Sequence, residues 1–285
     1  MREQTGNEVI RLYPQPAELK PLAGLYLEQD VRAQSEGRTH PLLYANFVHS
    51  LDGRIAVPDK VHGGISVPKA VANDRDWRLF QELAVQADVI ITTGRYLRDY
   101  AAGKAQEILR IHDDPAFADL VQWRDQHNLP PLPDLAVVSS SLDFPIPQTL
   151  SEQKRRVIVV TDSNADTEKV ERIRHQLGEV VVVDSPQDGK GVDGHSLVEV
   201  LAAKGYHAVY SAAGPRILHM LLVADVLDRL YLTTVPRLLG GDPFAAITDG
   251  PLLDTPVDMR LQTLYFDTAG ADELGQLFAC YARVH

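Results

Sequence analysis

Val209-Tyr210-Ser211-Ala212-Ala213-Gly214-Pro215-Arg216 is the stretch that decides the fold. An apolar strand breaks here into small residues and restarts as the apolar helical pattern of residues 217–222. Such a junction leaves the first N–H groups of the helix free of side chains, which suits a bound phosphate. The run fits equally well a tight strand-to-helix turn, in which Gly214 supplies an unusual backbone angle and Pro215 takes the first helical position. Other segments must decide between the two interpretations.

The composition predicts a soluble globular protein. The chain has 285 residues, of which 45% are hydrophobic, enough for one large or two small domains with a buried core. The net charge of -11 argues against a nucleic-acid or anionic-membrane partner. The single cysteine, Cys280, cannot form an intrachain disulfide, which points to the reducing cytoplasm. No apolar run approaches the roughly 18 residues that span a bilayer.

Short apolar strands alternate with helical patterns along most of the chain. We expect strands at residues 42–49, 88–93, 135–139, 156–161, 179–183, 207–210 and 228–235, and helices at 73–85, 115–127, 167–177 and 196–204. Strands as continuously apolar as residues 157–160 and 180–183 are typical of a parallel sheet covered on both faces. The predicted fold class is therefore α/β.

The two ends of the chain follow different patterns. Residues 260–266 and 276–284 read as strands joined by a loop too short for a crossover, so we expect an antiparallel C-terminal hairpin. Residues 1–40 read as an extension that packs on a main domain of residues 41–285. Within this extension, Leu19, Leu22 and Tyr26 are spaced for one helix face, and a polar linker follows.

Several chemical signatures are weak or missing. Residues 189–194 match the G-x-G-x-x-G spacing, but five residues separate them from the preceding strand, so we interpret them as a surface loop. The chain has no G-x-S-x-G elbow and no H-x-x-x-H pair, and one cysteine cannot supply a zinc deaminase site. We therefore expect no metal, and chemistry from an organic cofactor if there is any.

Polar or small residues follow four further strands. Ser50 and the turn at Asp52-Gly53 follow the strand at 42–49, and Gly94-Arg95 follows the strand at 88–93. Residues 139–141 are three serines, and residues 236–241 end in two glycines. Open α/β sheets bind ligands at the carboxyl ends of their strands, so these segments could meet at one site. Each segment alone would be unremarkable as a turn.

Taken in order, these segments resemble the pyrimidine reductase family of riboflavin biosynthesis. This family also forms the reductase domain of the bacterial bifunctional deaminase-reductase and has a dihydrofolate-reductase-like fold. Residues 46–56 resemble its A-x-S-L-D-G-x-I-A turn, 88–95 its D-A-I-L-V-G strand, 212–222 its G-G-P-x-L helix start and 226–241 its P-x-L-L-G-G end. The resemblance implies a mostly parallel mixed central sheet with helices on both faces.

The resemblance also implies an activity and a site. The family uses NADPH to reduce the ribosylamino group of a phosphorylated aminopyrimidine to a ribitylamino group, and it forms homodimers. Family-like placement puts the cofactor against Leu51, Ile55, Gly94, Arg95, Ser139, Ser140, Thr161, Ala213, Gly214, Pro215 and Arg216. The substrate would meet Asn46, Ser50, Asp52, Ile65 and Ser66, with Asp52 as the catalytic residue that orients it.

Three departures from the family pattern leave the substrate open. The family's E-G-G reads Ala212-Ala213-Gly214, its D-E-L reads Asp228-Arg229-Leu230, and its L-R-A reads Leu83-Ala84-Val85. One alternative is an NADPH reductase of the same fold that acts on a different pterin-like or pyrimidine substrate. The other is a nucleotide-binding protein without turnover.

Overall fold

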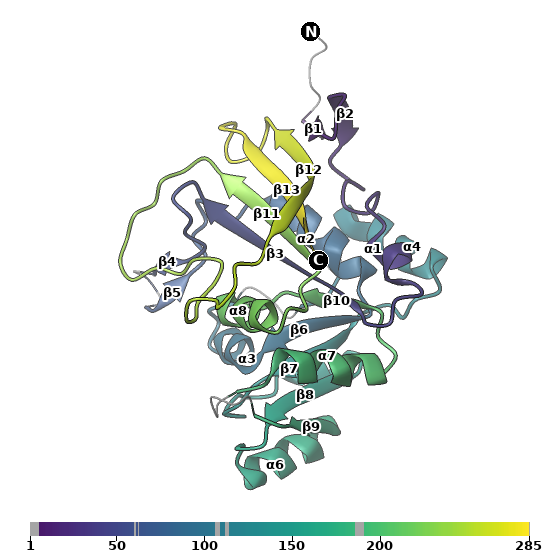
Figure 1. Cartoon of the computed structure of the whole chain (residues 1–285), viewed down its shortest axis with the longest axis vertical. Coiled ribbons are helices and arrows are strands. Elements are labelled where there is room, and N and C mark those ends of the chain that lie inside the picture. The colour runs from purple at the N-terminus through teal and green to yellow at the C-terminus, as the bar shows by residue number, and fades with distance from the viewer. Residues whose placement is uncertain are drawn as a thin grey trace.

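The computed structural model describes residues 6–59, 61, 63–105, 109–111, 114–185 and 191–284. Within these residues, eleven strands form one mixed sheet in the order β2-β1-β12-β13-β11-β3-β10-β6-β7-β8-β9 (Figure 1). A separate two-stranded ribbon pairs β4 (Val57–Pro58) with β5 (Ile65–Ser66). No helix in the described part of the chain is long and apolar enough to cross a membrane.

Seven neighbouring strands of the sheet run parallel. They are β11 (Arg229–Val235), β3 (Leu42–Ser50), β10 (Ala208–Ser211), β6 (Val89–Thr93), β7 (Asp134–Val138), β8 (Val157–Asp162) and β9 (Glu179–Val183). Antiparallel pairing adds β13 (Gln276–Arg283), β12 (Met259–Asp267), β1 (Glu8–Tyr13) and β2 (Glu18–Pro21). The predicted α/β class, the mostly parallel mixed sheet and the C-terminal hairpin are confirmed.

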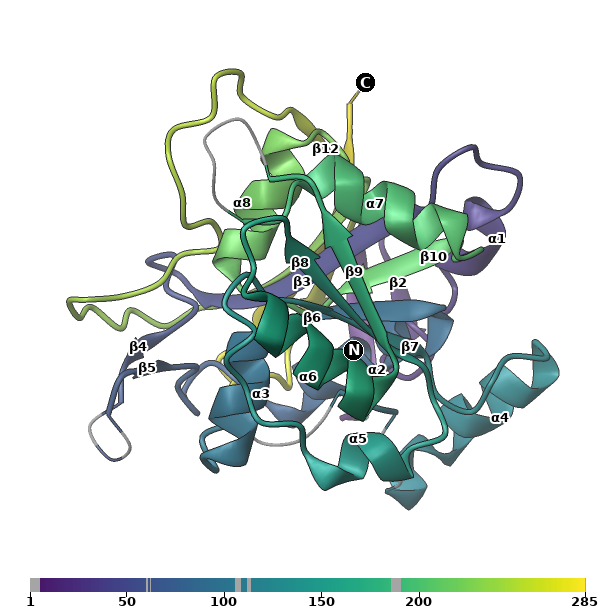
Figure 2. The ribbon, with the colours of Figure 1, turned by 90° about the horizontal axis from the view of Figure 1, so that it is seen from below.

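Helices cover both faces of the parallel strands. One hydrophobic core joins the sheet to α2 (Asp74–Gln86), α3 (Gly94–Ala101), α5 (Gln148–Glu152) and α6 (Thr167–Leu177). The opposite core joins it to α7 (Gly194–Ala203) and α8 (Pro215–Val223), as Figure 2 shows. A short 3-10 turn (Pro115–Phe117) leads into α4 (Ala118–Gln126), which packs against α2. The strands and helices predicted for the main domain form within two residues of the expected bounds.

The N-terminal segment differs from its predicted form. The helix face expected at Leu19, Leu22 and Tyr26 is absent, because residues 18–21 form β2 and a turn follows before α1 (Val31–Ser35). Pro21 and Gly24, whose φ is 87°, both oppose a helix there. Strand β1 instead pairs with β12, with Ile10 opposite Phe266, so the sheet extends beyond the C-terminal hairpin.

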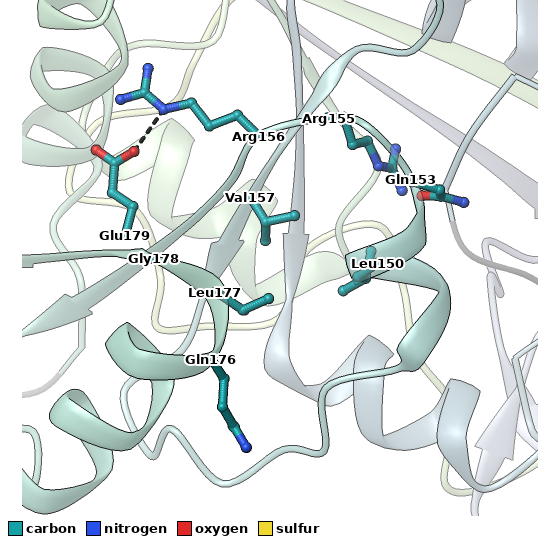
Figure 3. Close-up of a pocket in the computed structure, with 9 residues that line it drawn as sticks. All are labelled: Leu150, Gln153, Arg155, Arg156, Val157, Gln176, Leu177, Gly178 and Glu179. Carbon is teal, nitrogen blue, oxygen red and sulfur yellow. Dashed lines mark hydrogen bonds and ion pairs between the residues drawn. The ribbon is translucent and has the colours of Figure 1, made fainter.

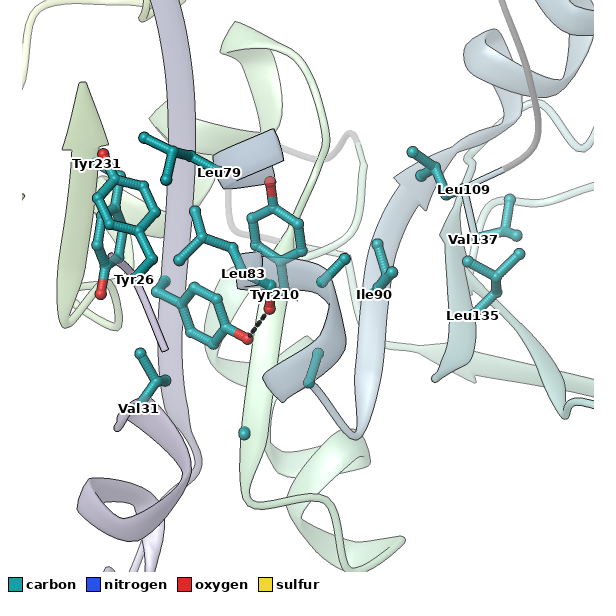
Figure 4. Close-up of a cluster of buried hydrophobic side chains, with 14 of the residues drawn as sticks. Tyr26, Val31, Leu79, Leu83, Ile90, Leu109, Leu135, Val137, Tyr210 and Tyr231 are labelled. Atoms are coloured by element: carbon teal, nitrogen blue, oxygen red, sulfur yellow. Dashed lines mark hydrogen bonds between the residues drawn. The ribbon is translucent and has the colours of Figure 1, made fainter. Parts of the chain in front are cut away.

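A layer of tyrosines fills the core beneath α2 (Figure 4). The rings of Tyr44 and Tyr210 stack with centroids 5.1 Å apart, and those of Tyr26 and Tyr231 lie 4.8 Å apart. The Tyr44 hydroxyl donates to the carbonyl of Leu83 on α2 at 2.8 Å. Burial raises the pKa of all four phenols well above the ordinary value, so they stay protonated.

Candidate active site at the carboxyl edge of the sheet

The carboxyl ends of the parallel strands bring the predicted segments to one edge of the sheet. Strand β3 ends at Ser50, β10 at Ser211, β6 at Thr93 and β7 at Val138. Two helices start close to the ends of adjacent strands: α3 follows β6 directly, and α8 follows β10 after three residues. Two helix N-termini, each with a partial positive charge, therefore lie at neighbouring positions of this edge.

The start of α8 is open. Gly214 is the N-cap residue and provides no side-chain hydrogen bond to the first N–H groups of the helix. Its φ of -76° is available to any residue, so the interpretation that Gly214 supplies an unusual backbone angle is wrong. A Cβ atom at Gly214 would meet nothing within 4 Å. The missing side chain thus leaves space over the helix N-terminus, as a phosphate seat requires.

The start of α3 is shaped by close packing. A Cβ atom at Gly94 would lie 2.7 Å from both Phe144 Cδ1 and Ser139 Oγ, so only glycine fits. Ser139 is buried, and its hydroxyl accepts a hydrogen bond from the N–H of Leu142 at 3.2 Å. Thr161 is also fully buried. These three predicted cofactor residues lie at the expected edge, where they shape the backbone beneath its surface.

Exposed cations surround the loop after β7. The Arg95 side chain is 67% exposed and lies 3.6 Å from Asp99. From α6, Lys169 donates to the carbonyl of Ser141 at 3.3 Å, and Arg172 donates to that of Leu142 at 2.8 Å. Ser140, in the loop itself, is exposed. Three cationic side chains therefore lie beside this loop, and one of them, Arg95, is paired with Asp99.

Asp52 joins two motifs that are far apart in the sequence. Its Oδ2 accepts the N–H of Gly240 at 2.9 Å and pairs with Arg54 Nη1 at 2.7 Å, while Oδ1 accepts the hydroxyl of Ser50. The Ser50 hydroxyl, the Gly240 N–H and other hydrogen bonds lower the pKa of Asp52 to about 2. The turn after β3 and the loop after β11 are thus tied together by a permanent anion.

The remaining predicted residues lie around this turn. Leu51 is 60% exposed at its tip, whereas Ile55 is buried and donates its N–H to the carbonyl of Ala245 at 2.9 Å. Ile65 and Ser66 form β5, and the Ser66 hydroxyl donates to Asp59 at 3.0 Å. Arg216 is exposed on the first turn of α8 and pairs with Asp249 at 2.9 Å.

Strand β3 continues beyond its neighbour β10. The β10 ladder stops where Ser211 meets Ala45, whereas the β11 ladder continues until Val235 meets Ser50. On the side that faces β10, the stretch Asn46–Ser50 of β3 therefore extends past the last residue of its neighbour. We call the gap that this leaves in the edge of the sheet the notch. The start of α8 lies at the other side of this notch, because only three residues, Ala212–Gly214, separate it from Ser211.

A carboxyl group that sequence reasoning missed faces the same stretch. Asp76 lies in the first turn of α2, and the hydroxyl of Thr233, which pairs with Val48 of β3, donates a hydrogen bond to it. Burial raises the pKa of Asp76 to about 6, although part of the residue is exposed. Asp74 and Asp76 look like ordinary acidic residues at a helix start, and no motif marks either of them.

A hollow of about 480 Å³ opens at the opposite, amino edge of the sheet (Figure 3). Apolar side chains of Leu150, Val157 and Leu177 line it, beside the ion pair of Arg156 with Glu179 at 2.7 Å. None of the predicted site residues lies there. Among the described residues, no group of three or more His, Cys, Asp or Glu side chains is placed to hold a metal ion.

Comparison with known proteins identifies the family. A family model described as the RibD C-terminal domain matches residues 41–272. The chain belongs to this family. No curated protein sequence matches the chain. Membership of the RibD C-terminal domain family confirms the predicted resemblance and supports an oxidoreductase of riboflavin biosynthesis.

Solved structures agree with this family in fold. A pyrimidine reductase-like protein from Corynebacterium diphtheriae is 18% identical, with a TM-score of 0.61 over 86% of this chain and 92% of that chain. The reductase Rib7 of Saccharomyces cerevisiae is 13% identical, with a TM-score of 0.59 over 92% and 99%. RibD of Acinetobacter baumannii is 16% identical, with a TM-score of 0.57 over 88% of this chain but only 60% of that longer chain.

Proposed function

We propose that the protein is an NADPH-dependent reductase of riboflavin biosynthesis, which reduces the ribosylamino group of a phosphorylated aminopyrimidine to a ribitylamino group. The observation that carries this proposal is the pair of adjacent helix N-termini beside a notch in the sheet. One end of this edge suits phosphates, and the other holds a carboxyl group with a pKa near neutrality. The first would hold a dinucleotide, and the second would supply the proton that accompanies hydride transfer.

The residues at the edge fit a phosphorylated dinucleotide. The open N–H groups at Gly214 would bind its diphosphate, because no side chain caps them and no atom fills the space above. Arg95, Ser140 and the nearby Lys169 would bind the additional phosphate that distinguishes NADPH from NADH. The notch beside Asn46–Ser50 would receive the nicotinamide, which supplies the hydride when bound.

Asp76 would hold the proton that the reduction consumes. Reduction of the ring-opened imine of the substrate to an amine would need one hydride at the imine carbon, supplied by the dinucleotide, and one proton at the imine nitrogen. A carboxyl with a pKa of about 6 carries a proton in a useful fraction of molecules near neutral pH. Asp52, with a pKa of about 2, cannot do so and would instead position the loop at Gly240.

The remaining predicted substrate residues would line the pocket around this carboxyl. Asn46 accepts a hydrogen bond from the buried Tyr210 hydroxyl, which fixes its amide at the border of the notch. Ser50 is held by Asp52, and Ile65 and Ser66 lie on the ribbon that packs beside Gly241 through Val57 and Pro58. We propose that they orient the substrate.

A second substrate is favoured by one observation. Ala212, in place of the family's glutamate, removes a carboxylate from the segment that borders the notch, so a pterin-like or different pyrimidine substrate would suit the site. Oxidation of NADPH should be followed spectrophotometrically with the riboflavin intermediate and with pterin substrates in parallel. Turnover of the riboflavin intermediate alone supports the first proposal, and turnover of a pterin alone supports the second. NADPH-dependent thermal stabilisation without any turnover contradicts both and identifies a binding protein.

We also propose a cytoplasmic homodimer, whose interface uses the outer face of the antiparallel strands. Phe266 and Leu277 lie opposite each other on β12 and β13, and both are partly exposed. Leu232 on β11 and Leu264 on β12 flank the same face. Light scattering coupled to size-exclusion chromatography should give a mass twice that of the chain, and Phe266→Asp should give a monomer.

A further inference from the structure

The hollow at the amino edge of the sheet combines apolar walls with buried polar groups. Leu150 of α5, Val157 of β8 and Leu177 of α6 contribute the apolar side chains (Figure 3). Its volume of about 480 Å³ lies within the range of pockets that bind small molecules. The candidate active site lies at the opposite edge of the sheet, so a ligand in the hollow would be separate from the cofactor and the substrate.

Two arginines line the hollow, and they differ in their partners. Arg156 pairs with Glu179 at 2.7 Å, and its side chain is 48% exposed. Arg155 is only 9% exposed, and its Nη1 donates to the carbonyl oxygen atoms of Leu109 and Pro133. Within the described part of the chain, its Nε and Nη2 are buried and have no hydrogen-bond acceptor. Arg155 is therefore a buried cation with one unused edge.

The two unused donor atoms are the pair that binds a carboxylate side-on. The same two atoms of Arg75 donate to the two carboxylate oxygens of Asp267, at 2.6 Å from Nε and 2.7 Å from Nη2. Arg155 thus has the donors for a bidentate carboxylate. Burial lowers the pKa of Arg155 to about 10, so this side chain stays charged at neutral pH. A carboxylate ligand would remove the free-energy cost of burying these donors without a partner.

A buried acceptor lies next to this cation. Gln153 also lines the hollow, and its Oε1 has no donor among the described residues. The backbone N–H of Arg155 donates to the carbonyl of Gln153 at 2.7 Å, which holds the two residues together on the short segment between α5 and β8 (Figure 3). A buried amide oxygen needs an N–H or O–H donor. A ligand with a donor close to its carboxylate would satisfy both residues.

The opposite wall of the hollow is unsuited to an anion. Helix α6 ends at Leu177, and its C-cap residue, Gly178, lines the hollow. The last carbonyl groups of a helix carry a partial negative charge. Glu179, which follows, adds a carboxylate to this side. A carboxylate ligand should therefore bind at Arg155, with its apolar part toward Leu177.

We propose that this hollow is a second ligand site, which binds a small aliphatic α-hydroxy or α-amino acid. The carboxylate pairs with Nε and Nη2 of Arg155, the α-substituent donates to Oε1 of Gln153, and the aliphatic chain lies against the apolar side chains. The half-buried Gln153 side chain turns aside to admit the carboxylate, because the edge of the guanidinium lies beneath the surface. The inference goes beyond the proposed reductase function and does not depend on it, because no residue that lines the hollow belongs to the candidate active site.

The test titrates four compounds with the same branched aliphatic end into the full chain by calorimetry. Leucine and leucic acid carry a carboxylate and an α-donor, isocaproic acid lacks the donor, and isoamyl alcohol lacks the carboxylate. The better of the first two should bind about tenfold more tightly than isocaproic acid and about 100-fold more tightly than isoamyl alcohol. Whether it is leucine or leucic acid identifies the donor. No binding of either acid, or equal binding of isoamyl alcohol, would overturn the inference.

Variants of the two polar residues locate the binding. Arg155→Met should weaken it by about 100-fold, and Arg155→Lys, which keeps the charge but loses the paired donors, by about tenfold. Gln153→Met should make isocaproic acid bind as tightly as the better α-substituted acid, because the acceptor is gone. Arg156→Met is the matched control. It removes an arginine of the same hollow whose charge is already paired with Glu179, and should leave Kd within about twofold.

The outcomes separate this site from the reductase site. Wild-type affinity in folded Arg155→Met would overturn the inference, and so would a retained preference for the α-donor in Gln153→Met. If Arg155→Met does not fold, Arg155→Lys and Gln153→Met decide. Displacement of the bound acid by NADPH would also overturn the inference, because the hollow lies at the opposite edge of the sheet. Lack of reductase turnover, in contrast, would overturn only the proposed function.

Discussion

Two aspartates at one site differ in pKa because their surroundings stabilise opposite protonation states. Asp52 receives hydrogen bonds from Ser50 and from the N–H of Gly240, which favour its charged form. Asp76 receives a hydrogen bond from the hydroxyl of Thr233, but burial, the larger influence, favours its neutral form. A pair of carboxyls separated in this way provides a fixed anion and a proton carrier.

At this scale we predict that Asp76→Asn lowers kcat by about 100-fold, the usual loss when a general acid is removed. Because the folded-state pKa of Asp76 is raised to about 6, the folded protein binds this proton more tightly than the unfolded chain, and wild-type stability falls as pH rises toward 6. Above that pH, Asp76→Asn should be more stable than the wild type by up to about 3 kcal/mol. Steady-state kinetics and urea titration at several pH values check both effects. Equal kcat in the two proteins would eliminate the proton role.

Asp52→Asn should act mainly through the loop after β11. Because its pKa is lowered, ionised Asp52 stabilises the folded protein at pH values above the ordinary pKa of an aspartate. This contribution is lost as the pH falls through about 2. The variant should therefore be less stable at neutral pH and should raise KM by roughly tenfold, with a smaller change in kcat. Asp272→Asn is the matched control. It breaks the exposed ion pair of Asp272 with Arg237, which lies on the loop after β11, and should change KM and stability little. Unchanged KM in Asp52→Asn contradicts the positioning role.

At the scale of elements, the order of strands explains why the site forms. Parallel neighbours bring their carboxyl ends together, and the short β10 next to the long β3 leaves the notch. The loop after β11 crosses this edge, where the N–H of Leu51 donates to the carbonyl of Arg237 and that of Asp249 donates to the carbonyl of Pro215. The loop thus links the turn at Asp52 to the first turn of α8.

The cations near α3 and α6 should determine the choice of cofactor. Arg95→Ala should weaken the binding of NADPH by about tenfold and leave that of NADH unchanged, because only NADPH carries the additional phosphate. Fluorescence titration with both dinucleotides measures the effect. Arg156→Ala is the control, since Arg156 pairs with Glu179 at the opposite edge of the sheet. An equal loss for NADH and NADPH would contradict this placement.

At the scale of the whole molecule, residues 9–31 contribute to the core of the main body. Val9, Leu25, Tyr26 and Val31 are buried in the same core as Tyr44 and Phe278. A chain that begins at residue 41 should therefore lack a cooperative thermal transition and should bind hydrophobic dyes. Circular dichroism during heating checks this, with deletion of residues 1–5 as the control. A cooperative transition at the wild-type Tm would show that residues 41–285 fold alone.

Sequence patterns were sufficient for the parallel part of the fold and for bringing the candidate segments to one edge of the sheet, because apolar periodicity and strand ends are local signals. The pairing of Ile10 with Phe266 could not be predicted, since it joins the two ends of the chain. Asp76 was missed for a similar reason: only the packing of α2 over Thr233 distinguishes it from Asp74. Ser139 and Thr161 lie at the expected edge, but both are buried, which their sequence neighbours alone do not indicate.

The most direct test of the account is calorimetric titration of NADPH into the wild type, Gly214→Ala and Gly214→Asp. Gly214 has an ordinary φ and open space around it, so both variants should fold, and aspartate should even cap α8. We predict that Gly214→Asp raises or preserves Tm but weakens NADPH binding by about 100-fold or more, because a carboxylate then occupies the phosphate seat. Gly214→Ala should bind within about tenfold of the wild type. Wild-type affinity in Gly214→Asp would contradict the central claim that the start of α8 binds the diphosphate.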